Sequence, residues 1–159
     1  MPRTLMISSP GGNLASALHL GQTLRQLGLQ TTVGSVMQDG YGQRALTSGS
    51  CHSACVMVLM GGVGRSVLPG SQVGVHSPRT HVMVQGQHYV LDDASSRRLA
   101  DPAMRSYTRR MGVSPALIDA ANAVPHTSIR TLTPAEMARF GLVTSGYRRG
   151  NAVRQRGRA

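Results

Sequence analysis

The first 36 residues alternate between strand and helix patterns, and this order constrains the fold more than any other feature of the sequence. The stretch TLMIS (residues 4–8) has the composition of a short buried strand, and SPGG at residues 9–12 interrupts it. Apolar residues then recur at helical spacing, with Asn13 as the expected N-cap and Gly28 as the expected C-cap. A second strand is expected at residues 31–36. This strand–helix–strand order predicts a parallel sheet with a right-handed crossover.

The remainder of the chain continues the alternation and predicts an α/β class. Residues 39–50 are rich in glycine and serine and predict a loop, whereas residues 53–60 are apolar on all sides, as in a buried helix. The further expected elements are short strands at 66–68 and 72–76, a strand–turn–strand at 80–91, helices at 92–111, 114–124 and 133–141, and a last strand at 142–144. Ser114 is the expected cap of the second of these helices, and Thr133 with Glu136 is expected to form a capping box at the start of the third. The length suits one domain, expected over residues 1–147, followed by a basic and flexible tail at 148–159.

The charged residues are few and mostly basic. The chain of 159 residues carries a formal net charge of +11 with 17 basic residues, every one of them arginine. A serine–lysine dyad is therefore excluded. Aromatic residues are scattered rather than interleaved with the arginines, so a solvated basic surface is favoured over a nucleic-acid site. No run approaches the ~20 apolar residues of a membrane-spanning helix.

Residues 50–55 read SCHSAC, in which Ser53 stands midway between the only two cysteines, Cys51 and Cys55. A serine becomes exposed as a nucleophile on a sharp strand-to-helix turn, where the residues two before and two after it must be small. Cysteine is compact, and a bond between the two cysteines would fix such a turn covalently. Two other interpretations stay open. Ser53 can be a small residue in a tight turn, or the cysteines and His52 can bind a metal, although this spacing is poor for zinc.

A nucleophilic serine also needs a base and donors for the oxyanion. His76 ends the strand expected at residues 72–76, where its side chain can leave the sheet and face the turn. The amides of Gly11 and Gly12 follow the first strand and precede a helix, so they can point at a bound carbonyl. Four further histidines are interpreted as structural or surface residues: His19, His81, His88 and His126.

Four motifs in one order resemble the proteolytic subunit of the ATP-dependent Clp protease and the wider Clp–crotonase superfamily. They are SPGG at residues 9–12, the turn serine, LPGSQVGVH at 68–76 and TPAEMARFGLV at 133–143. The chain is most similar to an uncharacterised, predicted periplasmic branch whose turn reads C-x-S-x-C, and the similarity spans residues 4–145. The resemblance implies an α/β domain built as a spiral of ββα units. It also implies assembly into a trimeric, hexameric or heptameric ring.

The resemblance assigns roles to four residues. Ser53 matches the nucleophile and His76 matches the general base. Gly12 matches one backbone donor of the oxyanion hole, and the amide of Ala54 matches the other. No cofactor and no metal are implied.

The third member of the catalytic triad is where the sequence departs from the family. In the Clp proteases an aspartate stands upstream of the glycine that matches Gly141, and the corresponding position here is Ile129. The surrounding VPHTSIRTL contains no carboxylate. Without an orienting group, a serine–histidine pair loses up to ~10⁴ in turnover. The groups that remain as orienters of His76 are a backbone carbonyl, Ser128, and the carboxylates of Asp92, Asp93 and Asp101.

The sequence therefore predicts a serine hydrolase, specifically a peptidase that acts on short or unfolded peptides. The alternative is a catalytically inactive, Clp-like scaffold or peptide-binding oligomer, which the missing aspartate motivates. A disulfide between Cys51 and Cys55 would place the protein in an oxidising compartment, and a periplasmic location is expected, with the cytoplasm as the alternative. The expected partners are a peptide or unfolded-protein substrate and further copies of the chain.

Overall fold

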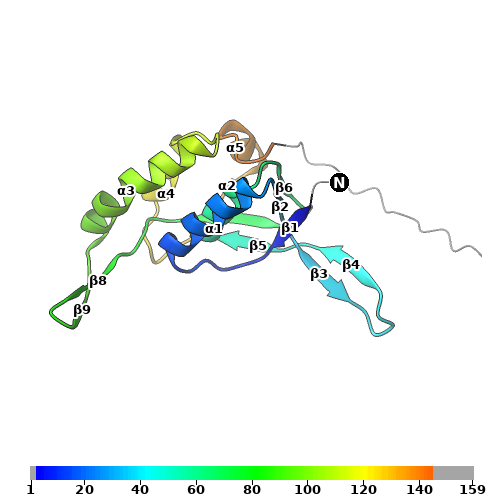
Figure 1. The fold of residues 1–159 in the computed structure, drawn as a ribbon, viewed down its shortest axis with the longest axis horizontal. Helices are drawn as coiled ribbons and strands as arrows, with labels where there is room; N and C mark the ends of the chain where they lie inside the picture. The colour runs from blue at the N-terminus through cyan, green and yellow to red at the C-terminus, as the bar shows by residue number, and fades with distance from the viewer. Residues whose placement is uncertain (1–2, 145–159) are drawn as a thin grey trace, which may run out of the picture.

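The computed structural model describes residues 3–144, so the tail expected at residues 148–159 lies outside the described residues. The strands are β1 (Thr4–Ile7), β2 (Gln30–Val33), β3 (Ser35–Gln38), β4 (Arg44–Thr47), β5 (Ser50–His52), β6 (Arg65–Val67), β7 (Gln72–Val75), β8 (His81–Val84), β9 (Gln87–Val90) and β10 (Arg130–Thr131). The helices are α1 (Leu14–Gln26), α2 (Cys55–Gly61), α3 (Asp93–Arg110), α4 (Ala116–Asn122) and α5 (Pro134–Arg139) (Figure 1).

Two small sheets form the centre of the fold. The first has the order β1-β2-β6 and is parallel throughout, as the strand–helix–strand pattern predicted. The second has the order β10-β7-β5, with β5 parallel to β7 and β10 antiparallel to it. The chain leaves the first sheet after β1 and pairs at Ser9 with Cys51 of β5, so the two sheets are joined at this point.

Each turn of the chain adds a strand to each sheet and then a helix. The chain runs from β2 to β5 and then α2, and from β6 to β7 and then α3. This repetition is the spiral of ββα units expected from the sequence. Helix α1 packs against α2, and α2 in turn packs against β2, β5 and β7.

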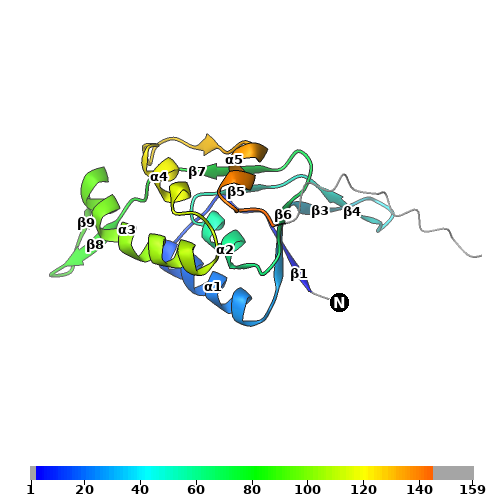
Figure 2. The same ribbon diagram turned by 90° about the horizontal axis from the view of Figure 1, so that it is seen from above.

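Two hairpins depart from this plan and project from opposite ends of the molecule (Figures 1 and 2). The β3–β4 hairpin is inserted between β2 and β5, and the β8–β9 hairpin lies between β7 and α3. Both expose large apolar side chains, among them Met37 and Leu46 on the first and Met83 and Val84 on the second.

The helix ends follow from local sequence chemistry. The side chain of Asn13 accepts a hydrogen bond from the amide of Ser16 at 2.9 Å, and this cap starts α1 as predicted. Thr133 and Glu136 form a reciprocal capping box at the start of α5, also as predicted. Ser114 is not the N-cap of α4, because Pro115 occupies that position.

Two other sequence predictions are wrong. Residues 39–50, predicted as a loop, contain β4 and the start of β5, because pairing with β3 and β7 overrides the local glycine and serine content. Residues 142–144, predicted as a strand, form none. Leu142 instead buries its side chain in the core, while Thr144 hydrogen-bonds Arg65 beside the first sheet.

Candidate active site

Ser53 lies on a strained turn between β5 and α2. Its φ angle is +58°, a left-handed conformation that non-glycine residues adopt rarely. The amide of Ser53 donates to the carbonyl of Gly74 at 3.0 Å, which ties the turn to β7. The carbonyl of Ser53 accepts from the amide of Val56 in the first turn of α2. The chain thus lifts the Ser53 side chain out of the strand at the N-terminus of a buried helix, and strain of this kind is concentrated at functional sites.

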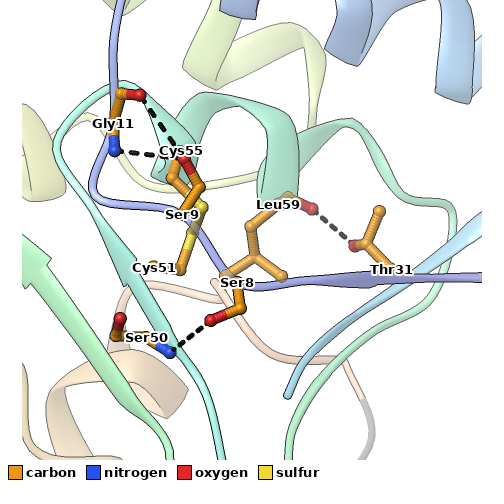
Figure 3. The surroundings of a disulfide bond; sticks show 8 residues. All are labelled: Ser8, Ser9, Gly11, Thr31, Ser50, Cys51, Cys55 and Leu59. Carbon is orange, nitrogen blue, oxygen red and sulfur yellow. Dashed lines mark hydrogen bonds between the residues drawn. A yellow bond between two sulfur atoms is a disulfide. The ribbon is translucent and has the colours of Figure 1, made fainter. Parts of the chain in front are cut away.

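A disulfide closes the base of this turn (Figure 3). Cys51 and Cys55 are bonded, their Cα atoms are 5.3 Å apart, and both side chains are buried. The two bonded cysteines stand two residues before and two residues after Ser53, as the sequence spacing suggested. It also removes the alternative of a metal site with His52, since disulfide sulfurs offer no thiolate ligand. Within residues 3–144, no cluster of three or more histidine, cysteine and acidic side chains could hold a metal ion.

The SPGG loop lies against the same turn. The amide of Ser9 donates to the carbonyl of Ser50 at 2.7 Å, and the amide of His52 donates to the carbonyl of Ser9 at 3.1 Å. Ser9 also accepts the amide of Gly11 with its hydroxyl, at 3.2 Å (Figure 3). A Cβ atom on Gly11 would lie 2.8 Å from Cβ of Ser53, so only glycine permits this approach. The close contact between the SPGG loop and Ser53 therefore depends on the glycine at position 11.

Two backbone amides beside Ser53 have no partner. Among the hydrogen bonds of residues 3–144, none uses the amide of Gly12 or the amide of Ala54. The amide of Gly11 is different, because Ser9 already occupies it. Gly12, Ala54 and Ser53 line one cavity. Unpaired amides at a cavity wall are the donors that a developing oxyanion requires.

His76 follows the last residue of β7 and lines the same cavity. Its Nδ1–H donates to the carbonyl of Ser77 at 2.7 Å, since a carbonyl can only accept. In the neutral ring Nε2 is then the acceptor, which is the form a general base needs. Among the described residues, no hydrogen bond joins the ring to the Ser53 hydroxyl.

None of the six acidic side chains contacts His76. Asp92 caps α3 through Ser95, Asp93 contacts His126 at 2.6 Å, and the other four have their own partners. Those four are Asp39 with two amides of its turn, Asp101 and Asp119 with Arg105, and Glu136 with Arg130 and Thr133. Asp92, Asp93 and Asp101, which the sequence left as possible orienters of His76, are each bonded to another group, and none of them hydrogen-bonds the His76 ring. The carbonyl of Ser77 is the group that contacts the ring.

The cavity has a volume of about 570 Å³ and two kinds of wall. The polar side is formed with Gly12 and Ala54 by the side chains of Asn13, Ser53, His76, Arg79, Thr80 and His81. The other side is apolar and is made chiefly by α2, α3 and α4, through Met57, Leu99, Met104, Leu117 and Ile118. This size is typical of a small-molecule or peptide side-chain site. Sequence reasoning missed the apolar wall. Leu117 and Ile118 stand within the helix expected at residues 114–124, and nothing in the sequence indicates that they border a cavity.

Tyr107 of α3 supports the helix that carries the turn. Its side chain is buried, and its hydroxyl donates to the carbonyl of Met57 at 2.6 Å. Burial raises the pKa of Tyr107 to about 12, against the opposing effect of nearby arginines such as Arg25. A Cβ atom on Gly21 would overlap the hydroxyl, so the glycine makes room for it between α1 and α2. This contact links α3 to the first turns of α2.

Comparison with known proteins gives a fold. No protein-family model matches the chain, and no curated protein matches it. Two solved structures that match are of the 1510-N membrane-bound stomatin-specific protease, one a serine-to-alanine mutant and the other a lysine-to-alanine mutant in complex with a substrate peptide. Each is 17% identical, covers 89% of this chain and has a TM-score of 0.56.

The chain spans 62% and 59% of the length of those two structures. The lysine named in the second has no counterpart in type here, because this chain contains no lysine. No helix within residues 3–144 combines the length and the apolar character needed to cross a membrane. At 17% identity the likeness concerns architecture. Residues 3–144 thus share the α/β, ClpP-like fold of these two protease structures.

Proposed function

We propose that the protein is a serine peptidase in which Ser53 is the nucleophile and His76 is the general base. The observation that carries this proposal is that one cavity is lined by the strained serine, the histidine and two unpaired amides. The fold, shared with a protease whose structure contains a substrate peptide, supports the same class of reaction. No cofactor enters the reaction.

The proposed chemistry is acyl transfer in two steps. The hydroxyl oxygen of Ser53 attacks the peptide carbonyl while Nε2 of His76 accepts its proton. The oxyanion receives hydrogen bonds from the amides of Gly12 and Ala54, with the N-terminus of α2 favouring the negative charge. The imidazolium then protonates the leaving amine. Water, deprotonated by the same ring, releases the acyl group from Ser53.

The carbonyl of Ser77 takes the position that a carboxylate occupies in a full triad. It fixes the tautomer of His76 by accepting the Nδ1 proton at 2.7 Å. A neutral carbonyl stabilises the imidazolium less than a carboxylate does, so we expect a slow enzyme. A carboxylate-to-amide change in a serine protease triad costs about 10⁴ in turnover. The apolar wall of the cavity suits an extended peptide with an apolar side chain beside the cleaved bond.

Hydrolysis of fluorogenic peptides tests this proposal. The wild-type protein, with its disulfide intact, is expected to cleave an unstructured peptide that carries leucine or methionine at the bond. Ser53→Ala should abolish cleavage and also hydrolysis of an activated ester. Ser16→Ala is the matched control, because Ser16 is exposed on α1 and its hydroxyl has no partner. Activity that survives in Ser53→Ala would overturn the proposal.

A non-catalytic peptide-binding protein is the second candidate. It is favoured by one observation, that all six carboxylates are engaged away from His76. Under this alternative the wild-type protein binds peptide in the cavity but shows no turnover and no reaction with an active-serine probe. Peptide affinity measured on wild type and Ser53→Ala, together with turnover, separates the two functions.

We propose a location from the disulfide and an assembly from the resemblance to the Clp proteases. A disulfide persists in an oxidising compartment, so we place the protein in the periplasm. Ring assembly, as a trimer, hexamer or heptamer, remains a prediction of the resemblance to the Clp proteases. The substrate in this setting is a short or unfolded peptide.

A further inference from the structure

The β8–β9 hairpin carries a compact group of side chains of metal-ligating types, and one of them, His81, also lines the cavity of the candidate active site. His81, Met83 and His88 are all exposed. The register pairs Met83 directly with His88 and His81 with Val90. Because paired residues of an antiparallel hairpin share a face and alternate residues return to it, His81, Met83 and His88 lie on one face.

One nitrogen of the His81 ring faces one nitrogen of the His88 ring. Nδ1 of His81 lies 2.9 Å from Nε2 of His88, with ring centroids 4.9 Å apart. Two imidazole nitrogens bound at ~2.0–2.1 Å to one ion lie roughly 3.3 Å apart at a tetrahedral angle. The rings therefore need to separate only slightly to admit an ion between them. The thioether of Met83 is on the strand position directly opposite His88, at a typical Cβ–Cβ separation of ~4.5–5.5 Å.

The backbone holds this group in register. Gln85 and Gly86 both have positive φ angles, +50° and +78°, which is the two-residue turn that matches the twist of a hairpin. At the base, the amide of Leu91 donates to the carbonyl of Thr80 at 2.9 Å. The amide of Thr80 donates to the hydroxyl of Ser96 in α3 at 3.0 Å, so the hairpin is anchored to a helix.

We propose that His81, Met83 and His88 form a copper site that binds Cu(I). Imidazole nitrogens suit zinc, copper, iron and nickel, whereas a thioether suits Cu(I), so copper is the metal that both ligand types share. Both ligand nitrogens must present a lone pair to the ion. The proton that the two rings now share in their hydrogen bond moves to the other nitrogen of its own ring, and neutral rings release no proton. Solvent exposure of all three side chains gives the ion a path to the site.

The sequence alone indicates that the two histidines are structural or surface residues. The signal in the sequence was H-x-M followed by a Q-G turn and a second histidine, HVMVQGQH at residues 81–88. That pattern becomes a ligand set only if the hairpin turns at residues 85–86, which places Met83 opposite His88.

Anaerobic competition with a chromophoric Cu(I) chelator tests the proposal on the full chain. The wild-type protein is expected to withdraw one equivalent of Cu(I) from the chelator. His81→Ala and His88→Ala should each weaken binding by about tenfold or more, since even outer-shell changes at metal sites cost 10–100-fold. Met83→Leu should weaken Cu(I) binding while leaving Zn(II) binding by the two imidazoles unchanged.

Matched controls are His19→Ala and Met37→Leu, which remove an exposed histidine on α1 and an exposed methionine on the other hairpin. Both should bind Cu(I) as the wild type does. Ser53→Ala should also bind normally, so the outcome is independent of the proposed peptidase activity. The proposal is overturned if the double variant of His81 and His88 competes as well as the wild type. It is also overturned if Met83→Leu retains full Cu(I) affinity.

Discussion

Gly11 sets how closely the SPGG loop approaches the candidate nucleophile. Its φ angle is +115°, and a Cβ atom there would lie 2.8 Å from Cβ of Ser53 and 2.9 Å from the carbonyl oxygen of His52. A methyl group at this position would therefore push the loop away from the turn and strain the backbone at the same time.

We expect Gly11→Ala to lower the free energy of unfolding by more than the roughly 1–3 kcal/mol that a strained backbone conformation alone costs, because its methyl group also clashes with Ser53 and His52. It should also lower reactivity of Ser53, because the amide of Gly12 moves with the loop. Gly28→Ala is the control, with a φ angle of +66° and open space around its Cβ position. Chemical denaturation gives both values. If Gly28→Ala costs as much as Gly11→Ala, the close contact with Ser53 contributes nothing to stability.

The sequence predicted the residues that line the cavity better than it predicted the group that hydrogen-bonds His76. Ser53, His76, Gly12 and Ala54 were chosen from motif order, and all four line one cavity. The hydrogen bond from His76 to the carbonyl of Ser77 was not predictable in particular, because any backbone carbonyl near a ring can accept and only the tertiary structure selects one.

Two contacts between elements support the turn that carries Ser53. The first is made by Tyr107 of α3, whose hydroxyl donates to the carbonyl of Met57 in α2. The neutral phenol is favoured in the fold, so its pKa of about 12 lies above the ordinary value of ~10. Stability that depends on this neutral hydroxyl is complete below pH ~10 and is lost as the pH rises from ~10 towards ~12.

We expect the free energy of unfolding of the wild type to fall by up to about 2–3 kcal/mol across that alkaline range. Tyr107→Phe should be less stable at neutral pH by about 1–3 kcal/mol, because the carbonyl of Met57 loses its buried donor. Its alkaline slope should be shallower than that of the wild type. Tyr41→Phe serves as the control, since Tyr41 is 93% exposed. Equal alkaline slopes in wild type and Tyr107→Phe would contradict this account.

The disulfide is the contact on the β5 side. Thiol titration of the denatured, non-reduced protein should find no free thiol. Replacing both Cys51 and Cys55 by alanine should lower the free energy of unfolding by about 2 kcal/mol, the chain-entropy value for so short a loop. The variant should also lose part of the reactivity of Ser53, because the turn can relax from its left-handed conformation. Full reactivity without the bond would show that the backbone alone maintains the turn.

Elements with strong local signals were predictable, and those that depend on long-range pairing were not. The caps at Asn13 and Thr133 are properties of a few adjacent residues, and both were found. Strand β4 sits in a glycine-rich segment whose only reason to be extended is its partner β3. The same limit explains why residues 142–144 were assigned to a strand that does not form.

Two hairpins project from opposite ends of the molecule (Figure 2). Both expose apolar side chains, and this bears on assembly. Met37 is 62% exposed and Leu46 is 65% exposed on the β3–β4 hairpin. The register pairs Val36 with Leu46, so these two exposed side chains share one face of the hairpin and Met37 lies on the other. Exposed apolar surface on a projecting element marks an interaction site more often than scattered single residues do. Light scattering after gel filtration should give a mass of several chains for the wild type. Met37→Glu combined with Leu46→Glu should lower that mass without unfolding the domain, and an unchanged mass would exclude this hairpin from the interface.

The central claim is that His76 activates Ser53 across the shared cavity, and covalent labelling by a fluorophosphonate tests it most directly. Peptide mapping of the wild-type protein should place one adduct on Ser53. In His76→Gln the labelling rate should fall about 10²–10⁴-fold, the usual contribution of a general base. An unlabelled wild-type protein, an adduct on another serine, or an equal rate in His76→Gln would contradict the claim.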